Sequence, residues 1–193
     1  MSTPKILVFA GSIRTGSFNA RLAALAAKEL ALAGADVTRI SLQDFPLPIY
    51  DGDLEANSGP PANAVKLKQM MMAHQGVFIA SPEYNASVTP LLKNTLDWIS
   101  RMREGKETPL AAYKNRVFAL GSASNGVYGG MRSLLALRQV LEIGCGALVI
   151  PDQVAVSRAA DAYDDMDNLK DDRSADLLRA VVRRLIDMAR HFA

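Results

Sequence analysis

Residues 6–19 read Ile6-Leu7-Val8-Phe9-Ala10-Gly11-Ser12-Ile13-Arg14-Thr15-Gly16-Ser17-Phe18-Asn19. The first five are apolar and form a run of the length of a buried strand, and the residues that follow Asn19 are rich in alanine and leucine, as in a helix. A polar loop between a first strand and a first helix is where α/β proteins bind phosphate, because the N-terminus of the helix offers unpaired N–H groups and a partial positive charge. The stretch therefore predicts an α/β fold with an anion site at its first loop.

The side chains of this loop suit a terminal phosphate group. They are the hydroxyls of Ser12, Thr15 and Ser17, the amide of Asn19 and the guanidinium of Arg14. A planar guanidinium can bind two phosphate oxygens at once. A simpler interpretation is a helix cap, formed by Ser17 or Asn19, beside an unrelated arginine. A P-loop is disfavoured because Ser17-Phe18 stands where Lys followed by Ser or Thr is required, and the Gly-x-Gly-x-x-Gly fingerprint of dinucleotide-binding folds is absent.

Length and composition predict one globular domain over residues 1–193. The chain is 49% hydrophobic and 22% charged, with a net charge of +2 and no basic stripe, which argues against nucleic-acid binding. Cys145 is the single cysteine, so intrachain disulfides and a cysteine-built zinc site are excluded and a reducing compartment is favoured. Neither a signal peptide nor an uncharged apolar run of ~20 residues is present, and we expect a cytoplasmic protein without membrane insertion.

Strand-like and helix-like patterns alternate along the chain. We expect strands at 5–10, 37–42, 77–80, 116–120 and 147–150, helices at 18–33, about 62–75, 90–102, about 131–143 and 174–191, and a long proline-containing loop at 44–61. This alternation predicts a parallel sheet covered by helices on both faces. Five strands in this order favour the flavodoxin-like variant of the doubly wound fold, with the polar-apolar strand 37–42 near an edge.

Three loops follow the carboxyl ends of the strands, where ligands bind in such folds. They are residues 11–17, 81–88 and 121–130. The second loop contains Pro82-Glu83-Tyr84-Asn85, and the third contains small residues and glycines that allow the backbone to approach a ligand closely. One loop for phosphate and two for a planar ring predict a mononucleotide-like cofactor.

These motifs resemble those of the NAD(P)H-dependent FMN reductase family, which includes bacterial chromate, quinone and ferric reductases. The family's phosphate-loop pattern, Gly-Ser-x-Arg-x-x-Ser-x-Asn, is matched without a gap at residues 11–19, and its flavin-ring motif is matched at residues 82–85. Further matches are Ser87, Leu92-Lys93-Asn94 and Asp97-Trp98. One position departs, because Thr89, followed by Pro90, stands where the family pattern has proline. The resemblance extends from the first expected strand to the fifth.

The resemblance implies an enzyme with bound FMN that takes hydride from NADPH or NADH. It implies reduction of quinones, flavins, ferric complexes or chromate by a ping-pong mechanism, in a homodimer or homotetramer. The implied FMN-binding residues are Ser12, Arg14, Ser17, Phe18, Asn19, Pro82, Glu83, Tyr84, Asn85, Ser122, Ser124 and Gly126. Because the chemistry belongs to the cofactor, no catalytic side chain and no metal ligand is assigned.

Two other functions fit parts of the pattern. A flavodoxin-like electron carrier would bind FMN without oxidising NAD(P)H, although such carriers are commonly acidic. A serine hydrolase is a weaker alternative, because residues 122–126 lack the first glycine of Gly-x-Ser-x-Gly.

The remaining features are interpreted structurally. Glu83 is expected to be a solvated loop carboxylate, and Cys145 a small buried residue. The helix at 90–102 has more apolar residues than one stripe requires, so we expect it at a subunit interface. The acidic segment 161–172 does not match an EF-hand, and the arginines of the last helix are expected to face solvent.

Overall fold

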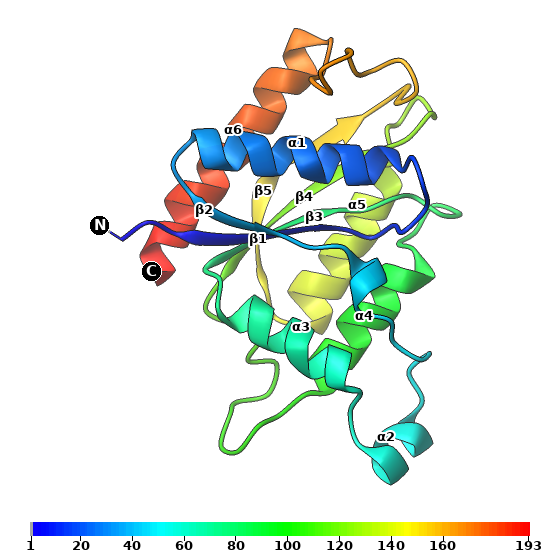
Figure 1. The fold of residues 1–193 in the computed structure, drawn as a ribbon, viewed down its shortest axis with the longest axis vertical. Coiled ribbons are helices and arrows are strands. Elements are labelled where there is room, and N and C mark those ends of the chain that lie inside the picture. The colour runs from blue at the N-terminus through cyan, green and yellow to red at the C-terminus, as the bar shows by residue number, and fades with distance from the viewer. Residues whose placement is uncertain (1) are drawn as a thin grey trace.

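A five-stranded parallel sheet forms the centre of the computed structural model, which describes residues 2–193 (Figure 1). The strands are β1 (Lys5–Ala10), β2 (Asp36–Arg39), β3 (Gly76–Ala80), β4 (Val117–Ala123) and β5 (Leu148–Val156). Their order across the sheet is β2-β1-β3-β4-β5, and every neighbouring pair is parallel. This is the strand order of the flavodoxin-like doubly wound fold, so the predicted fold class is confirmed, with β2 at an edge.

Helices cover both faces of this sheet. They are α1 (Phe18–Leu32), α2 (Gly52–Ser58), α3 (Ala62–Met72), α4 (Pro90–Arg101), α5 (Met131–Arg138) and α6 (Asp172–Ala189), with 3-10 turns at 42–44 and 190–192 and a π-helical turn at 139–144. Helices α1 and α6 lie on one face, and α3, α4 and α5 lie on the other (Figure 1). Within residues 2–193, no helix combines the length and apolar character needed to span a bilayer.

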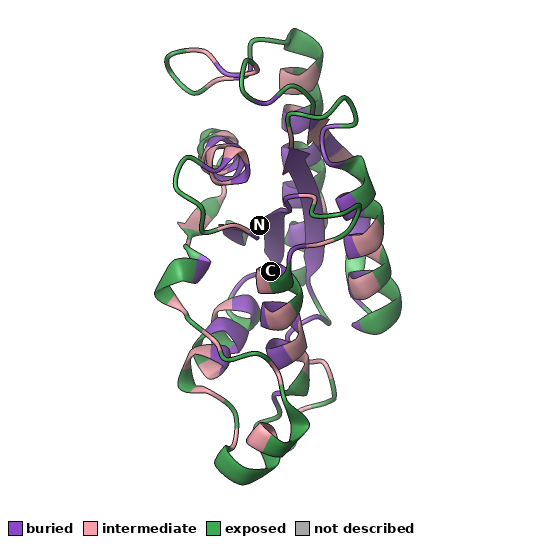
Figure 2. Ribbon diagram, turned by 90° about the vertical axis from the view of Figure 1, so that its right-hand side faces the viewer, coloured by how far each residue is buried: buried purple, intermediate pink, exposed green. Residues whose placement is uncertain are grey.

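Strand residues alternate between the two faces, as the period of two in a β-strand requires. In β1, Ile6 and Val8 pack with α1 and α6, whereas Leu7 and Phe9 pack on the opposite side with α3, α4 and α5. Because both faces are covered, the central strands are buried along almost their whole length (Figure 2). This explains why their sequences are continuous apolar runs rather than alternating ones.

Helix α2 lies inside the segment 44–61 that we predicted to be a loop. The carboxylate of Asp51 caps it by accepting hydrogen bonds from the N–H groups of Asp53 and Leu54, at 2.8 and 3.3 Å. None of its residues is buried, so it has no apolar stripe for a sequence pattern to detect.

Strands β4 and β5 are longer than predicted. β4 continues through Gly121 to Ala123, and β5 continues to Val156, because these segments pair with each other after a register shift. Ser122 therefore belongs to a buried strand rather than to the loop that follows.

The apolar surplus of α4 is buried within the chain. Leu96 and Ile99 face the main core, and Trp98 packs with Ala64 of α3 and with residues of the segment 47–54. The Trp98 indole donates to the carbonyl of Pro48 at 2.8 Å, and its ring meets Tyr50 edge-on with centroids 5.1 Å apart. Because the α2 segment and α3 cover this surplus, it no longer supports the subunit interface that we expected here, and that interface stays a prediction.

Cys145 is buried where the π-helical turn leads to β5, as expected. Burial, with the nearby charge of Asp97, raises the pKa of its thiol to about 11. Because the thiolate is the reactive form, we expect native protein at pH 8 to react with Ellman's reagent roughly 100-fold more slowly than the protein unfolded in guanidinium. Release of the reagent's chromophore measures both rates. Equal rates in the two samples would show that the thiol is accessible in the folded chain.

Candidate functional site

The first wall of the candidate site is the loop between β1 and α1. Gly16 has φ +68°, a conformation that glycine adopts without strain, and it turns the chain into the helix. Ser17 is the N-cap, and its hydroxyl accepts a hydrogen bond from Ala20 N–H at 3.3 Å. The first turn of α1 contains no acidic residue. The positive end of the helix is therefore free to attract an external anion.

Backbone donors of this loop are largely unused. Of the N–H groups from Ser12 to Asn19, only those of Arg14 and Ser17 have a hydrogen-bond partner among residues 2–193. The Arg14 N–H reaches the Ser12 hydroxyl at 3.4 Å, and the Ser17 N–H reaches the Arg14 carbonyl at 3.1 Å. The others are available to phosphate oxygens, which is the donor chemistry that helix N-termini offer to anions.

Arg14 adds a charge that no carboxylate in the described chain neutralises. Its guanidinium donates only to the carbonyls of Thr15 and Gly16, both at 3.3 Å, and lies 5.7 Å from the centroid of the Phe18 ring. It forms no ion pair with any of residues 2–193. A cation that remains unpaired beside free N–H groups fits a dianionic ligand.

The amide of Asn19 does not face the phosphate loop, although we expected it to bind the phosphate. Its side-chain N–H donates to the carbonyl of Ala123 at 2.8 Å, and its oxygen accepts from the N–H of the same residue at 3.0 Å. Both partners are buried, so the amide joins the start of α1 to the end of β4. Only the backbone N–H of Asn19 is free for a ligand.

Glu83 in the second loop is not the solvated carboxylate that we expected. Its side chain is only 9% exposed and forms an ion pair with Arg132 in the first turn of α5. Arg132 Nε donates to the carboxylate at 2.7 Å, and Arg132 N–H donates to it at 3.1 Å. This pair raises the pKa of Arg132. Forty-nine residues separate the partners, and no local signal in the sequence connects them.

Tyr84 and Asn85 occupy a tight turn in the same loop. The N–H and carbonyl of Tyr84 pair with those of Ser87, both at 3.0 Å, and Asn85 has φ +50°. Tyr84 is half-exposed and lines the cavity described below, whereas Asn85 does not. The turn therefore presents an aromatic side chain rather than the amide of Asn85 to the site.

The third loop is anchored by a serine that we expected to contact the ligand. Ser122 is fully buried and its hydroxyl donates to the carbonyl of Gly129 at 2.7 Å. Gly129 has φ +60°, and a Cβ there would lie 2.8 Å from backbone atoms of β5 and the residue after it. Ser122 thus holds the loop in place, and Gly126 also lies away from the cavity.

The three loops enclose a cavity of about 250 Å³. Its lining residues are Ser12, Arg14, Ser17, Phe18, Asn19, Pro82, Glu83, Tyr84, Ala123, Ser124 and Asn125. The structure therefore brings together all the predicted site residues except Asn85, Ser122 and Gly126. Ala123 and Asn125 lie within the stretch 122–126 that we expected to line the site, although neither was singled out as a binding residue. Asn125 lies within the third loop that the sequence singled out, whereas Ala123 has no side-chain chemistry to mark it.

A second cavity, of about 410 Å³, adjoins the first and shares Ser12, Arg14 and Tyr84 with it. Thr89, the position that departs from the family pattern, lies in its wall. The Thr89 hydroxyl donates to the carbonyl of Gly11 at 2.7 Å and accepts from Leu92 N–H at 3.2 Å. Threonine at this position therefore caps α4 and ties it to the first loop.

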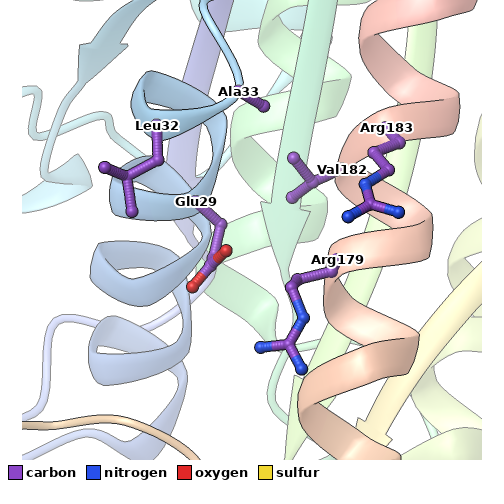
Figure 3. Close-up of a pocket in the computed structure, with 6 residues that line it drawn as sticks. All are labelled: Glu29, Leu32, Ala33, Arg179, Val182 and Arg183. Atoms are coloured by element: carbon purple, nitrogen blue, oxygen red, sulfur yellow. The ribbon is translucent and has the colours of Figure 1, made fainter.

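Away from these loops, a pocket of about 230 Å³ lies between α1 and α6. Its lining residues are Glu29, Leu32, Ala33, Arg179, Val182 and Arg183 (Figure 3). Figure 3 shows Glu29 of α1 and Arg179 of α6 extending into the space between the helices. The pocket lies at the opposite end of α1 from Ser17, and none of the loops predicted to bind a ligand contributes to it. Residues 2–193 contain no group of three or more His, Cys, Asp or Glu side chains arranged to hold a metal ion.

Comparison with known proteins agrees with this geometry. Residues 4–161 match the family described as NADPH-dependent FMN reductase. The chain is 38% identical over 138 residues to the quinone reductase of Escherichia coli K12, covering 71% of this chain and 69% of that protein. It is 30% identical over 182 residues to an NAD(P)H-dependent FMN reductase of Pseudomonas aeruginosa, covering 94% and 92%. The solved structure of FerB, a flavoenzyme NAD(P)H:(acceptor) oxidoreductase from Paracoccus denitrificans, superposes with a TM-score of 0.80 at 25% identity, covering 98% of this chain and 99% of that one.

Proposed function

This chain belongs to the NADPH-dependent FMN reductase family, and from that premise we propose that it is a reductase of quinones. It is an oxidoreductase that uses FMN and NAD(P)H. The observation that carries the proposal is the cavity at the N-terminus of α1, where free N–H groups and an unpaired Arg14 face the two further loops that the sequence singled out. The likeness to the quinone reductase of Escherichia coli supports the choice of acceptor.

The residues of the cavity fit FMN. The FMN phosphate would be held by Arg14, by the hydroxyls of Ser12 and Ser17 and by the free N–H groups at the start of α1. The ring would lie against Tyr84 and the backbone of the second and third loops. When bound, FMN would accept hydride from NAD(P)H and pass two electrons to an acceptor. The reduced acceptor would then take up protons from solvent.

The chain's own contribution is to position and shape the site. Asn19 fixes the phosphate helix against β4, and the ion pair between Glu83 and Arg132 fixes the second loop against α5. The same pair leaves the ring site without net charge from these groups. No side chain in the cavity needs to transfer a proton, so the proposed reaction requires only that donor and acceptor reach the same place in turn.

An open site of this kind explains a broad choice of acceptors. We propose a ping-pong order, in which NAD(P)⁺ leaves before the quinone enters, because donor and acceptor would use the same exposed region beside Tyr84. Free flavin, ferric complexes and chromate are further proposed acceptors, since little in the cavity selects for the shape of the acceptor. A cytoplasmic location accords with the single buried cysteine.

We also propose that the protein assembles as a homodimer or homotetramer. The apolar side chains of Val127, Tyr128, Met131 and Leu135 are exposed along α5 and the loop before it. Exposed apolar side chains gathered on one helix and its preceding loop are typical of a protein interface. Light scattering at micromolar concentration tests the proposal, and a monomer contradicts it.

The experiment that tests the function uses the purified protein reconstituted with FMN. We expect an oxidised-flavin absorption spectrum that is bleached by NADPH under anaerobic conditions and restored by a soluble benzoquinone. Initial rates against both substrates should give parallel double-reciprocal lines. A protein that binds FMN but is not bleached by either NADPH or NADH would be an electron carrier, and the proposed activity would be wrong.

A further inference from the structure

A cavity of about 270 Å³ lies beyond the carboxyl end of β5, separate from those described above. Its walls come from residues 156–162 and 169–174, that is, from the two ends of the connector between β5 and α6. Residues after 161 lie outside the family match, so the whole of the second wall, 169–174, belongs to the part of the chain that the match does not cover.

This cavity is a direct neighbour of the candidate FMN site. Asn125, which lines the FMN cavity, accepts a hydrogen bond from Ala160 N–H at 2.8 Å. Ser124 bonds through its N–H to the carbonyl of Val156 at 3.0 Å and through its carbonyl to the N–H of Ala159 at 3.1 Å. One pair of bonded segments, 124–125 and 156–160, therefore separates the two cavities.

Two unpaired cations line the cavity. Arg158 and Lys170 are exposed, and neither side chain has a carboxylate or hydrogen-bond partner within the described chain. Of the two carboxylates present, that of Asp171 accepts from Ser174 N–H and from the Ser174 hydroxyl, at 2.9 and 2.6 Å, as the cap of α6. Asp161 is the only carboxylate of the wall without a hydrogen-bond partner among residues 2–193, so two unpaired cations stand beside one free carboxylate and one that is turned to the cap of α6.

Three apolar residues complete the wall, together with Ser157 and Ser174. These apolar residues are Val156 and Leu169, which are buried, and Ala162, which is half-buried. An apolar surface beside two cations suits a ligand that has both a flat base and a phosphate group.

The cavity keeps its shape through contacts with α1. Arg21 of α1 forms an ion pair with Asp167 of the connector, and its guanidinium lies 4.4 Å from the centroid of the Tyr163 ring. The Tyr163 hydroxyl donates to the carbonyl of Phe18 at 3.3 Å, and Lys28 donates to Asn168 at 2.8 Å. A wall that is already ordered saves the ligand the free energy of ordering it.

Another arginine at this edge of the sheet makes a useful comparison. Arg39, at the end of β2, is also exposed and lines a cavity, but that cavity is only about 100 Å³. It has no second cation, and its volume is too small for a nucleoside.

We propose that the cavity of Arg158 and Lys170 binds the 2′-phosphoadenosine end of NADPH and gives the enzyme a preference for NADPH over NADH. The proposal rests on the proposed function, because it assumes that the nicotinamide end reaches the neighbouring FMN cavity. Arginine and lysine are the side chains that bind phosphate groups most strongly. The 2′-phosphate is the group that distinguishes NADPH from NADH.

The test measures binding of 2′,5′-ADP, with 5′-AMP for comparison, by isothermal titration calorimetry on the FMN-loaded protein. The variants are Arg158→Gln with Lys170→Gln, and the matched control is Arg39→Gln, which removes one exposed cation at the same edge of the sheet. We expect the double variant to bind 2′,5′-ADP at least about tenfold more weakly, whereas the control binds it like the wild type. Weak binding of 5′-AMP in all three proteins would show that the 2′-phosphate is the group recognised.

Steady-state kinetics form the second arm. In the double variant we expect the KM for NADPH to rise about tenfold, while the KM for NADH changes less than twofold and the flavin absorbance per protein stays constant. Equal losses with both dinucleotides, or unaltered binding of 2′,5′-ADP by the double variant, would overturn the proposal. If the wild type binds 2′,5′-ADP through these residues but oxidises neither dinucleotide, the nucleotide site stands and the proposed reductase function falls.

Discussion

Replacing Arg14 with alanine is expected to weaken FMN binding by about 100-fold, because alanine removes the charge-assisted hydrogen bonds to the phosphate. Such bonds are stronger than those between neutral groups. The guanidinium is the one full charge among the donors that face the phosphate, and it has no partner in the chain to compensate its loss. The folded state should be little affected, since the side chain is exposed and makes two hydrogen bonds of 3.3 Å within its own loop and one contact with the Phe18 ring. Quenching of flavin fluorescence during titration of the apoprotein gives the dissociation constant.

Two further variants make this result specific. Arg14→Lys keeps the charge but loses the fork of donors, so it should lie between the wild type and the alanine variant. Arg183→Ala removes an equally exposed cation that lines the pocket between α1 and α6, and it should bind FMN like the wild type. Unchanged FMN affinity in Arg14→Ala would show that the phosphate lies elsewhere.

Replacing Trp98 with alanine is expected to cost about 4 kcal/mol of the free energy of unfolding. The indole is fully buried, packs against α3 and the segment 47–54, and donates to the Pro48 carbonyl. Its loss would leave a large void and would free the chain around α2, which has no buried residue of its own. Urea unfolding measures the stability, and hydrogen exchange shows whether residues 46–58 lose protection.

Trp98→Phe is the matched control for this prediction. It retains most of the buried ring and loses the hydrogen bond to Pro48, so we expect a loss of about 1 kcal/mol. Similar stability for the alanine variant and the wild type would mean that α2 and α4 do not depend on each other. In that case the apolar surplus of α4 would again need another explanation.

The parallel sheet was predictable because its central strands are buried on both faces. Their apolar runs, bounded by residues such as Gly76 and Pro82, are a signal that needs no tertiary information. Helix α2 lacked such a signal, since no apolar stripe marks a helix that buries nothing. Lys68 shows the reverse difficulty. It is a charged residue of α3 that is fully buried, because Glu104 and Glu107 of a later loop form ion pairs with it.

The site could be predicted as three loops but not as individual contacts. Motif spacing identified Ser12, Arg14 and Ser17 because the loop and its helix are continuous in sequence. Asn19 has the residue type of a phosphate ligand, yet its amide is used by Ala123, which is more than one hundred residues away. Glu83 is likewise paired with the distant Arg132. Such pairings depend on which strand and helix ends the fold brings together, and local patterns in the sequence do not reveal them.

The order in which the chain is made gives α6 a particular importance. Its apolar side chains cover β3, β4 and β5 on the α1 side, and the ribosome produces them only after all five strands. A sheet that forms before α6 has been made would therefore have one apolar face partly bare. A chaperone that binds exposed hydrophobic surface would find this face throughout that interval and lose it once the last helix docks.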